Sequence, residues 1–198
     1  MNQLLALDQT LDEMYLSQAL HHRTIHFIEE FERESCYKAI YLMERIERLD
    51  DEENLPVEKR GHIKIVINSY GGVVYDLLAM ASTIKRLQNR GYIIETHVQG
   101  VAMSCGFLLA IMGTKGYRTM GEYATIMHHQ HSSGCMGEYQ TMVEDIEEQH
   151  KLWAVICGLV KAHTSITQEQ LDDMKSRKFN WFMDSKDAIN LNCIDSIY

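Results

Sequence analysis

The chain has 198 residues, which is long enough for one domain with a sizeable hydrophobic core. Its formal net charge of −9 at pH 7 argues against a nucleic-acid-binding surface. We find no long apolar run and no basic stretch followed by an apolar one near the start, so we expect neither a membrane span nor a secretory signal.

Cysteine and histidine usage bears on metal binding and on the redox environment. The five cysteines are scattered and form no Cys-x-x-Cys pair, which argues against a disulfide framework or a zinc site and favours a reducing, cytoplasmic location. Three of the ten histidines cluster at His128, His129 and His131, with no cysteine or carboxylate at ligand spacing beside them. We therefore expect no metal and no other cofactor.

The first third of the chain predicts an arm, a strand, a helix and a loop. Residues 1–13 mix apolar and polar side chains and are expected to form a mobile arm. Alternation over Arg23–Ile28 indicates a short strand. Ser35 is placed to cap a helix that runs to Leu49 on one apolar face. The charged run 50–60 holds the only proline and predicts a surface loop.

The next strand leads into two adjacent glycines. His62–Ile67 becomes continuously apolar and predicts a buried strand. Gly71 and Gly72 follow it within Asn-Ser-Tyr-Gly-Gly, which indicates a tight turn or a close approach of the backbone to a ligand. In isolation, a plain strand-to-helix turn is the commoner explanation. A helix with one apolar stripe follows and closes at Gly91.

A serine lies on the next predicted turn. The β-branched run Tyr92–Val98 predicts a strand, the stretch 100–106 a small-residue turn, and Phe107–Met112 a buried helix. This order puts the Ser104 hydroxyl at a helix N-terminus, where backbone N–H groups favour developing negative charge. On this stretch alone, a serine beside small residues is more often a helix cap than a nucleophile.

The repetition of strand, turn and helix predicts an α/β fold with a parallel sheet and helices on its faces. Sites in such sheets form outside the carboxyl ends of strands, so the Gly71–Gly72 turn and the Ser104 turn are expected to be neighbours. A glycine N–H from one turn and the Cys105 N–H from the other could then form an oxyanion hole.

A third strand supplies a candidate base. Ala124–Gln130 is apolar and ends in histidines, and strand alternation puts His128 and His129 on opposite faces. If His129 faces Ser104, it can take the hydroxyl proton and return it to a leaving amine. A single histidine is more often structural, but its position at a strand end in the same series favours the base.

The rest of the chain predicts mainly helices. Glu138–His163 is a long helix with an apolar stripe, and we favour a contact with another subunit over packing on the core alone. Thr164–Glu169 indicates a break and a capped short helix, and Lys175–Phe179 a basic loop. Ser185–Ala188 begins a last short helix, and Cys193–Ile197 predicts an edge strand.

Several segments together resemble the ClpP endopeptidases, although each alone is a weak signal. They are Ile67–Gly72, Gly100–Leu109, Ile126–Gln130, Ser17–Arg23 and Phe182–Asp195, and the resemblance covers about residues 15 to 197. It implies a ClpP/crotonase-like α/β fold of repeated ββα units with a protruding handle helix. It also implies a single domain over residues 1–198, with an axial N-terminal arm over about 1–16 and the handle over about 131–163.

The resemblance also implies roles for individual residues. Ser104 matches the nucleophile and His129 the base, while the backbone N–H groups of Gly72 and Cys105 match the oxyanion hole. The handle positions Gly134, Cys135 and Met136 match the strand that lies along a bound peptide.

The activity implied is that of a serine endopeptidase, the proteolytic subunit of an ATP-dependent Clp-type protease. Such subunits form two stacked heptameric rings that degrade unfolded polypeptides fed by an AAA+ unfoldase. ATP would belong to that partner, because this chain has no Gly-x-x-x-x-Gly-Lys-Ser/Thr loop.

The sequence departs from the family pattern at the third triad position, where Asn180 replaces aspartate. A neutral amide cannot stabilise an imidazolium by charge, and in the serine-protease template such a change lowers kcat by about 10⁴. If the alignment slips, Asp172, Asp173 or Asp184 is the third member. Tyr70, where the family usually has proline, and Cys105, where it usually has methionine, are smaller departures.

Two other functions stay open. Asn180 favours a catalytically impaired ClpP-like subunit that serves as a scaffold or regulatory ring member. A related crotonase-type enzyme acting on a CoA thioester shares the turn-built oxyanion hole, but it needs no Ser–His pair, so the presence of both Ser104 and His129 disfavours it.

Overall fold

The computed structural model describes residues 11–132, 134 and 136–198. Its strands are β1 (Thr24–Phe27), β2 (Ile63–Ser69), β3 (Ile94–Met103), β4 (Arg118–Met120), β5 (Thr125–His128), β6 (Trp181–Met183) and β7 (Ser196–Ile197). Its helices are α1 (Leu11–His22), α2 (Arg33–Glu52), α3 (Val74–Asn89), α4 (Cys105–Ile111), α5 (Tyr139–His163), α6 (Gln168–Arg177) and α7 (Ser185–Asn190), with a 3₁₀ turn η1 (Val57–Lys59).

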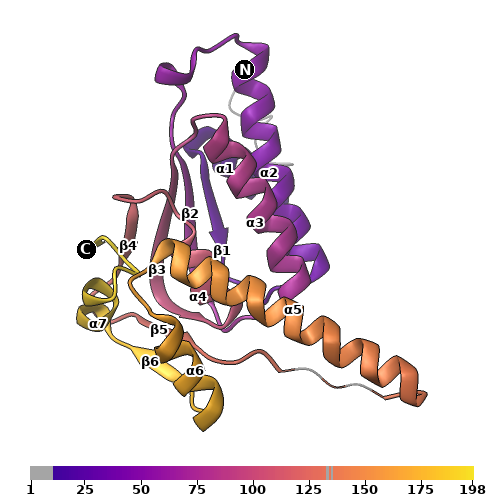
Figure 1. Ribbon diagram of the computed structural model, residues 1–198. Helices are drawn as coiled ribbons and strands as arrows, with labels where there is room; N and C mark the ends of the chain where they lie inside the picture. Colours follow the sequence, from indigo (N-terminus) through magenta and orange to yellow (C-terminus); the bar gives the residue numbers. More distant parts are fainter. Residues whose placement is uncertain (1–10, 133, 135) are drawn as a thin grey trace, which may run out of the picture.

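The described strands form one sheet, which confirms the predicted α/β class (Figure 1). Its main order is β1-β2-β3-β4-β7, with every pair parallel. β5 pairs with the far end of β3 in parallel, and β6 pairs with β5 antiparallel. The antiparallel β5–β6 pair brings the C-terminal part of the chain beside the strand that carries the histidines.

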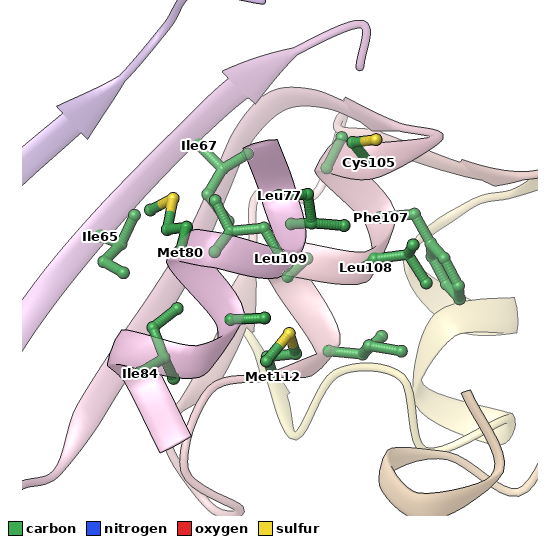
Figure 2. Packing of buried hydrophobic residues seen from close by; sticks show 14 of the residues in the cluster. Ile65, Ile67, Leu77, Met80, Ile84, Cys105, Phe107, Leu108, Leu109 and Met112 are labelled. Carbon is green, nitrogen blue, oxygen red and sulfur yellow. The ribbon is translucent and has the colours of Figure 1, made fainter. Parts of the chain in front are cut away.

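One face of the sheet carries the core. Ile65 and Ile67 of β2 are fully buried and point toward α3 and α4 (Figure 2). Leu77 and Met80 of α3 and Leu109 of α4 fill the space above them. Burying each such side chain is worth about 1.5–3 kcal/mol, so these contacts hold the two helices on the sheet.

The predicted buried strand is buried on one face only, and the opposite face of β2 is half-buried. Lys64 and Val66 alternate with the buried isoleucines and stay partly exposed. Glu95 and His97 lie at the matching positions of β3 and are also partly exposed. The apolar run was misleading because Val66, an apolar residue, lies on the half-open face.

β3 is the strand that positions the site. It runs to Met103, although a turn was predicted to begin at Gly100. Its first half pairs with β4 through Thr96–Val98, and its second half pairs with β5 through Val101–Met103. β4 itself was not predicted, since three residues that include an arginine and a threonine carry too little hydrophobic pattern.

Several predicted boundaries of helices need correction. Ser35 is not the N-cap of α2; Glu32 holds that position, and its N–H donates to the Ser35 hydroxyl at 3.1 Å. α2 continues to Glu52 and so takes up the first residues of the charged run. α6 ends at Arg177, where a loop was expected, and its C-cap residue Lys178 has the left-handed conformation, with φ 54°. The predicted cap of α6 is confirmed, because the Thr167 side chain accepts from the Gln170 N–H.

α5 is the protruding helix that the sequence predicted. Its 25 residues form one helix whose N-terminal end projects away from the sheet (Figure 1). Its buried side chains, from Leu152 to Val160, all lie in the C-terminal half. Tyr139 and Ile146, on the same apolar stripe, are exposed. The predicted arm lies mostly outside the described residues, and its last part, from Leu11, belongs to α1.

Candidate active site

Ser104 lies on a strained turn between β3 and α4. Its backbone angles are φ 54° and ψ −115°, a region that residues other than glycine rarely occupy. Its N–H donates to the Met127 carbonyl of β5 at 2.8 Å, which ties the turn to the neighbouring strand. The prediction of a sharp turn at the start of a helix is confirmed. The strain indicates that the surrounding structure imposes the position of this hydroxyl.

His129 faces Ser104, as predicted. It follows the last residue of β5, and its Nε2 lies 2.8 Å from the Ser104 Oγ. The predicted alternation also holds for His128, which points into the core on the opposite face of the strand and is 1% exposed. Burial, with a smaller effect from His131, lowers the pKa of His129. A lowered pKa keeps the imidazole neutral at pH 7, which is the form that can accept a proton.

The glycine turn after β2 lies against the Ser104 turn. A Cβ on Gly71 would lie 2.7 Å from the Ser104 Cβ and 2.9 Å from the Met103 carbonyl oxygen. A Cβ on Gly72 would lie 2.4 Å from the carbonyl oxygen of Phe31, with which Gly72 forms a parallel bridge. Both glycines have positive φ, at 114° and 146°. The expected neighbourhood of the two turns is therefore confirmed.

Cys105 has a side-chain role that the sequence did not predict. Its thiol donates to the carbonyl of Gly72 at 3.2 Å, so it links the start of α4 to the glycine turn. Burial raises the pKa of this thiol to about 12, which leaves it protonated and unsuited to act as a nucleophile. The oxyanion roles predicted for the N–H groups of Gly72 and Cys105 stay predictions.

Asn180 directly precedes β6, and His129 directly follows β5. Trp181 pairs with His128, and this is the last pair of the antiparallel ladder, which includes neither Asn180 nor His129. The Asn180 residue is exposed. Within the described part of the chain, neither Asn180 nor any carboxylate shares a hydrogen bond with His129. The pairing of β5 with β6 thus brings the segments that hold Asn180 and His129 together, and the role predicted for Asn180 stays a prediction.

The three alternative acids are engaged elsewhere. Asp184 caps α7 by accepting from the N–H groups of Lys186 and Asp187. Asp173 accepts from Arg177 and Asp172 from Gln168, both within α6. These contacts argue against each of the three as the partner of His129.

The predicted substrate-binding segment is only partly described. Gly134 and Met136 are exposed and lie outside any helix or strand, and Cys135 lies outside the described residues. Their predicted contact with a peptide remains a prediction.

The contact of Gly71 with Ser104 agrees with the predicted closeness of the two turns. Sequence reasoning did miss one contact near the site. Trp153 on α5 lies against the rings of His128 and His131, and no local pattern pointed to it.

Metal ligands and membrane spans were searched among the described residues. In residues 11–132, 134 and 136–198, no three His, Cys, Asp or Glu side chains gather closely enough to hold a metal ion. None of the described helices combines the length and the apolarity needed to cross a membrane.

Three curated proteins are similar to this chain in sequence. The ATP-dependent Clp protease proteolytic subunit of Deinococcus radiodurans is 30% identical over 135 residues, which are 68% of this chain and 64% of that protein. Proteolytic subunit 2 of Synechococcus sp. (strain CC9605) is 28% identical over 91% of this chain and 85% of its own. Proteolytic subunit 1 of Chlamydia felis is 33% identical over 68% of this chain and 64% of its own.

The matches to the Deinococcus and Chlamydia proteins thus span less than two thirds of those proteins' length. A sequence model of the Clp protease family matches residues 8–198, which include the Ser104 turn, His129 at the end of β5, and α5. On this match and on the fold described above, the chain belongs to the Clp protease family.

Proposed function

We propose that this chain is a serine endopeptidase subunit in which Ser104 is the nucleophile and His129 the general base. The observation that carries the proposal is the 2.8 Å contact between Ser104 Oγ and His129 Nε2, made from a strained turn. A neutral imidazole at this distance can accept the hydroxyl proton as the oxygen attacks a peptide carbonyl.

The first half of the reaction follows from this geometry. Ser104 Oγ bonds to the carbonyl carbon, its proton passes to His129 Nε2, and negative charge develops on the carbonyl oxygen. The N–H groups of Gly72 and Cys105 belong to the two turns beside Ser104 and are the proposed donors to that oxygen. His129 then gives the proton to the leaving amine, which departs as the peptide bond breaks and leaves an ester on Ser104.

The second half regenerates the enzyme. His129 removes a proton from a water molecule, whose oxygen attacks the ester carbonyl and forms a second tetrahedral intermediate. The proton returns to Ser104 Oγ as the carboxylic product leaves. Neither half of the reaction consumes ATP, so we assign ATP hydrolysis to a partner protein.

Partners and assembly are part of the proposal. The relatives are named as proteolytic subunits of ATP-dependent Clp proteases. We infer that this chain also self-associates, into stacked heptameric rings, and receives unfolded polypeptide from an AAA+ unfoldase of the Clp type. The exposed Tyr139 and Ile146 on the projecting half of α5 support a subunit contact there, because isolated apolar faces of this kind are usually covered. Gly134, Cys135 and Met136 remain the proposed peptide-binding positions.

A second candidate is a subunit with impaired catalysis that acts as a scaffold or regulatory ring member. Asn180 supports it, since this residue is exposed and shares no hydrogen bond with His129 in the described structure. In the serine-protease template, loss of the aspartate charge lowers kcat by about 10⁴, or about 5.5 kcal/mol of barrier.

A fluorophosphonate probe separates the two candidates. The wild type and the Ser104→Ala, His129→Ala and Asn180→Asp variants are labelled, and the modified residue is mapped by mass spectrometry on samples sized for assembly. We expect labelling of Ser104 in the wild type and none in Ser104→Ala or His129→Ala. Labelling of Ser104 that occurs only in Asn180→Asp would identify an impaired subunit. If Ser104 is labelled in none of the assembled forms, the proposed peptidase function is contradicted.

A further inference from the structure

His128 and His131, on either side of His129 in the sequence, both have aromatic contacts with the same side chain of α5. His128 is 1% exposed, and neither of its ring nitrogens has a hydrogen-bond partner within the described residues. Its ring lies 4.9 Å from the ring of Phe107 and 6.2 Å from that of Trp153, almost parallel to the latter at 6°. Burial of an unpaired imidazole costs free energy, so packing is what this ring contributes.

His131 follows His129 in the chain, and its ring contacts the same tryptophan. Its ring centroid lies 5.9 Å from that of Trp153 at an interplanar angle of 30°. Its Nε2 is 2.9 Å from the Gln149 Oε1 of α5, one turn before the tryptophan. Trp153 is 7% exposed and thus largely enclosed by these partners. One side chain of α5 therefore contacts both His128 and His131, which precede and follow His129 in the chain.

The stack also reaches the nucleophile. Phe107 lies on α4, three residues after Ser104, and is fully buried. The rings of Phe107, His128 and Trp153 thus join α4, which begins beside Ser104, to α5 and to β5, whose last residue precedes His129. A displacement of this strand would change the 2.8 Å distance between Ser104 and His129.

His129 needs this packing because the side chain that would hold its ring in a catalytic triad shares no hydrogen bond with it in the described structure. In the described structure no carboxylate or amide shares a hydrogen bond with His129 besides the Ser104 contact. Positioning counts strongly in catalysis, since a displacement of about 1 Å can cost about a hundredfold in rate.

We propose that Trp153 is a positioning residue for His129, acting through the rings of His128 and His131. The inference rests on the proposed serine-peptidase function, because it assigns Trp153 a part in the reactivity of the Ser104–His129 pair. Trp153 is not itself a catalytic residue in this proposal.

The surroundings of Trp153 explain why its loss would be felt at His129. The tryptophan borders a cavity of about 410 Å³ whose titratable lining groups are His131, Asp145, His150 and Lys175. The Lys175 Nζ lies 5.7 Å from the ring centroid of Trp153. A smaller side chain would enlarge this open space beside His131 and let water reach the strand end.

The test compares Trp153→Leu, Trp153→Phe and Gln149→Leu with the wild type in the assembled protein. The rate of fluorophosphonate labelling at Ser104 is measured between about pH 5 and pH 9. Val160→Ala is the matched control, since Val160 is fully buried on the same helix about two turns away. It should lower thermal stability without changing the pH midpoint of labelling.

We expect Trp153→Leu to slow labelling by about ten- to a hundredfold and to raise the pH midpoint, because burial lowers the pKa of His129 and the variant relieves that burial. Trp153→Phe retains a ring and should keep most of the rate. Gln149→Leu removes only the hydrogen bond to His131 and should shift both readouts in the same direction, by less. A wild-type rate and midpoint in Trp153→Leu would overturn the proposal.

A second measurement keeps the two proposals separable. Modification of His129 by diethyl pyrocarbonate, mapped by mass spectrometry across pH, reports its pKa and accessibility whether or not Ser104 is active. If the wild type shows no labelling of Ser104, the proposed function fails. The positioning role then stands on a raised pKa of His129 in Trp153→Leu but not in Val160→Ala, and an unchanged pKa refutes it.

Discussion

Trp181 pairs with His128 as the last pair of the antiparallel ladder of β5 and β6, and Asn180 and His129 are the next residues beyond it on the two segments. This pairing brings the segment that holds Asn180 to the end of β5, which His129 follows. The acids that a slipped alignment offered lie in α6 or cap α7, where they bind neighbours on their own helices.

Asn180→Asp should increase the reactivity of Ser104. A carboxylate beside His129 stabilises the imidazolium that forms as Ser104 attacks, and the template suggests a gain of up to about 10⁴-fold. The rate of fluorophosphonate labelling measures it, with Asn190→Asp, at an exposed position of α7, as the control for added charge. A rate within about twofold of wild type in Asn180→Asp would mean that the residue does not reach His129.

Gly71→Ala should damage both stability and reactivity. The added methyl would meet the Ser104 Cβ at 2.7 Å, on a backbone with φ 114°. We expect a loss of about 2 kcal/mol or more in the free energy of unfolding and a loss of Ser104 labelling.

Gly116→Ala is the matched control for that loss. Gly116 also has a positive φ, 91°, but a Cβ there would meet nothing within 4 Å. It should cost only about 1 kcal/mol, from backbone strain, and leave labelling unchanged. Equal effects of the two variants in urea unfolding and labelling would refute a steric role for Gly71.

His128 should make the fold sensitive to acid. Burial lowers its pKa from 6.5 to about 3, so below pH 6.5 the unfolded chain binds a proton that the folded chain rejects. The free energy of unfolding should fall by about 2 kcal/mol between about pH 6.5 and pH 5 from this residue alone. The lowered pKa values of His129, His131 and His163 act in the same direction.

His128→Leu removes this titration and the unpaired ring nitrogens. Urea unfolding at several pH values should show a flatter pH dependence than the wild type, with the stability at neutral pH retained or increased. A slope identical to that of the wild type would show that His128 is accessible to protons in the folded state.

Asp195→Ala should be strongly destabilising. Arg118 is 2% exposed, and its guanidinium donates to both carboxylate oxygens of Asp195, at 2.9 and 2.6 Å. Removal of the acid leaves a buried charge without its partner, which costs about 3–5 kcal/mol. Asp173→Ala breaks an exposed pair with Arg177 and should cost at most about 1 kcal/mol in the same urea experiment. Comparable losses in the two variants would contradict the buried character of the first pair.

The local features of this protein were readable from its sequence. Steric limits on the backbone explain the turns at the small residues around Ser104 and at the glycines after β2. The two-residue period of a strand explains which way each histidine at the end of β5 points. The parallel α/β fold and the Ser104–His129 pair followed from these patterns, because parallel strands deliver their carboxyl ends to the same edge of a sheet.

Tertiary structure decided what lies around that pair. The extension of β3 to Met103, the pairing of β4, and the half-open face of the sheet depend on neighbours distant in the sequence. So does the meeting of His128, His131 and Trp153, which no periodicity marks. A local pattern sets which way a side chain points, whereas its partner there is set by packing among distant segments.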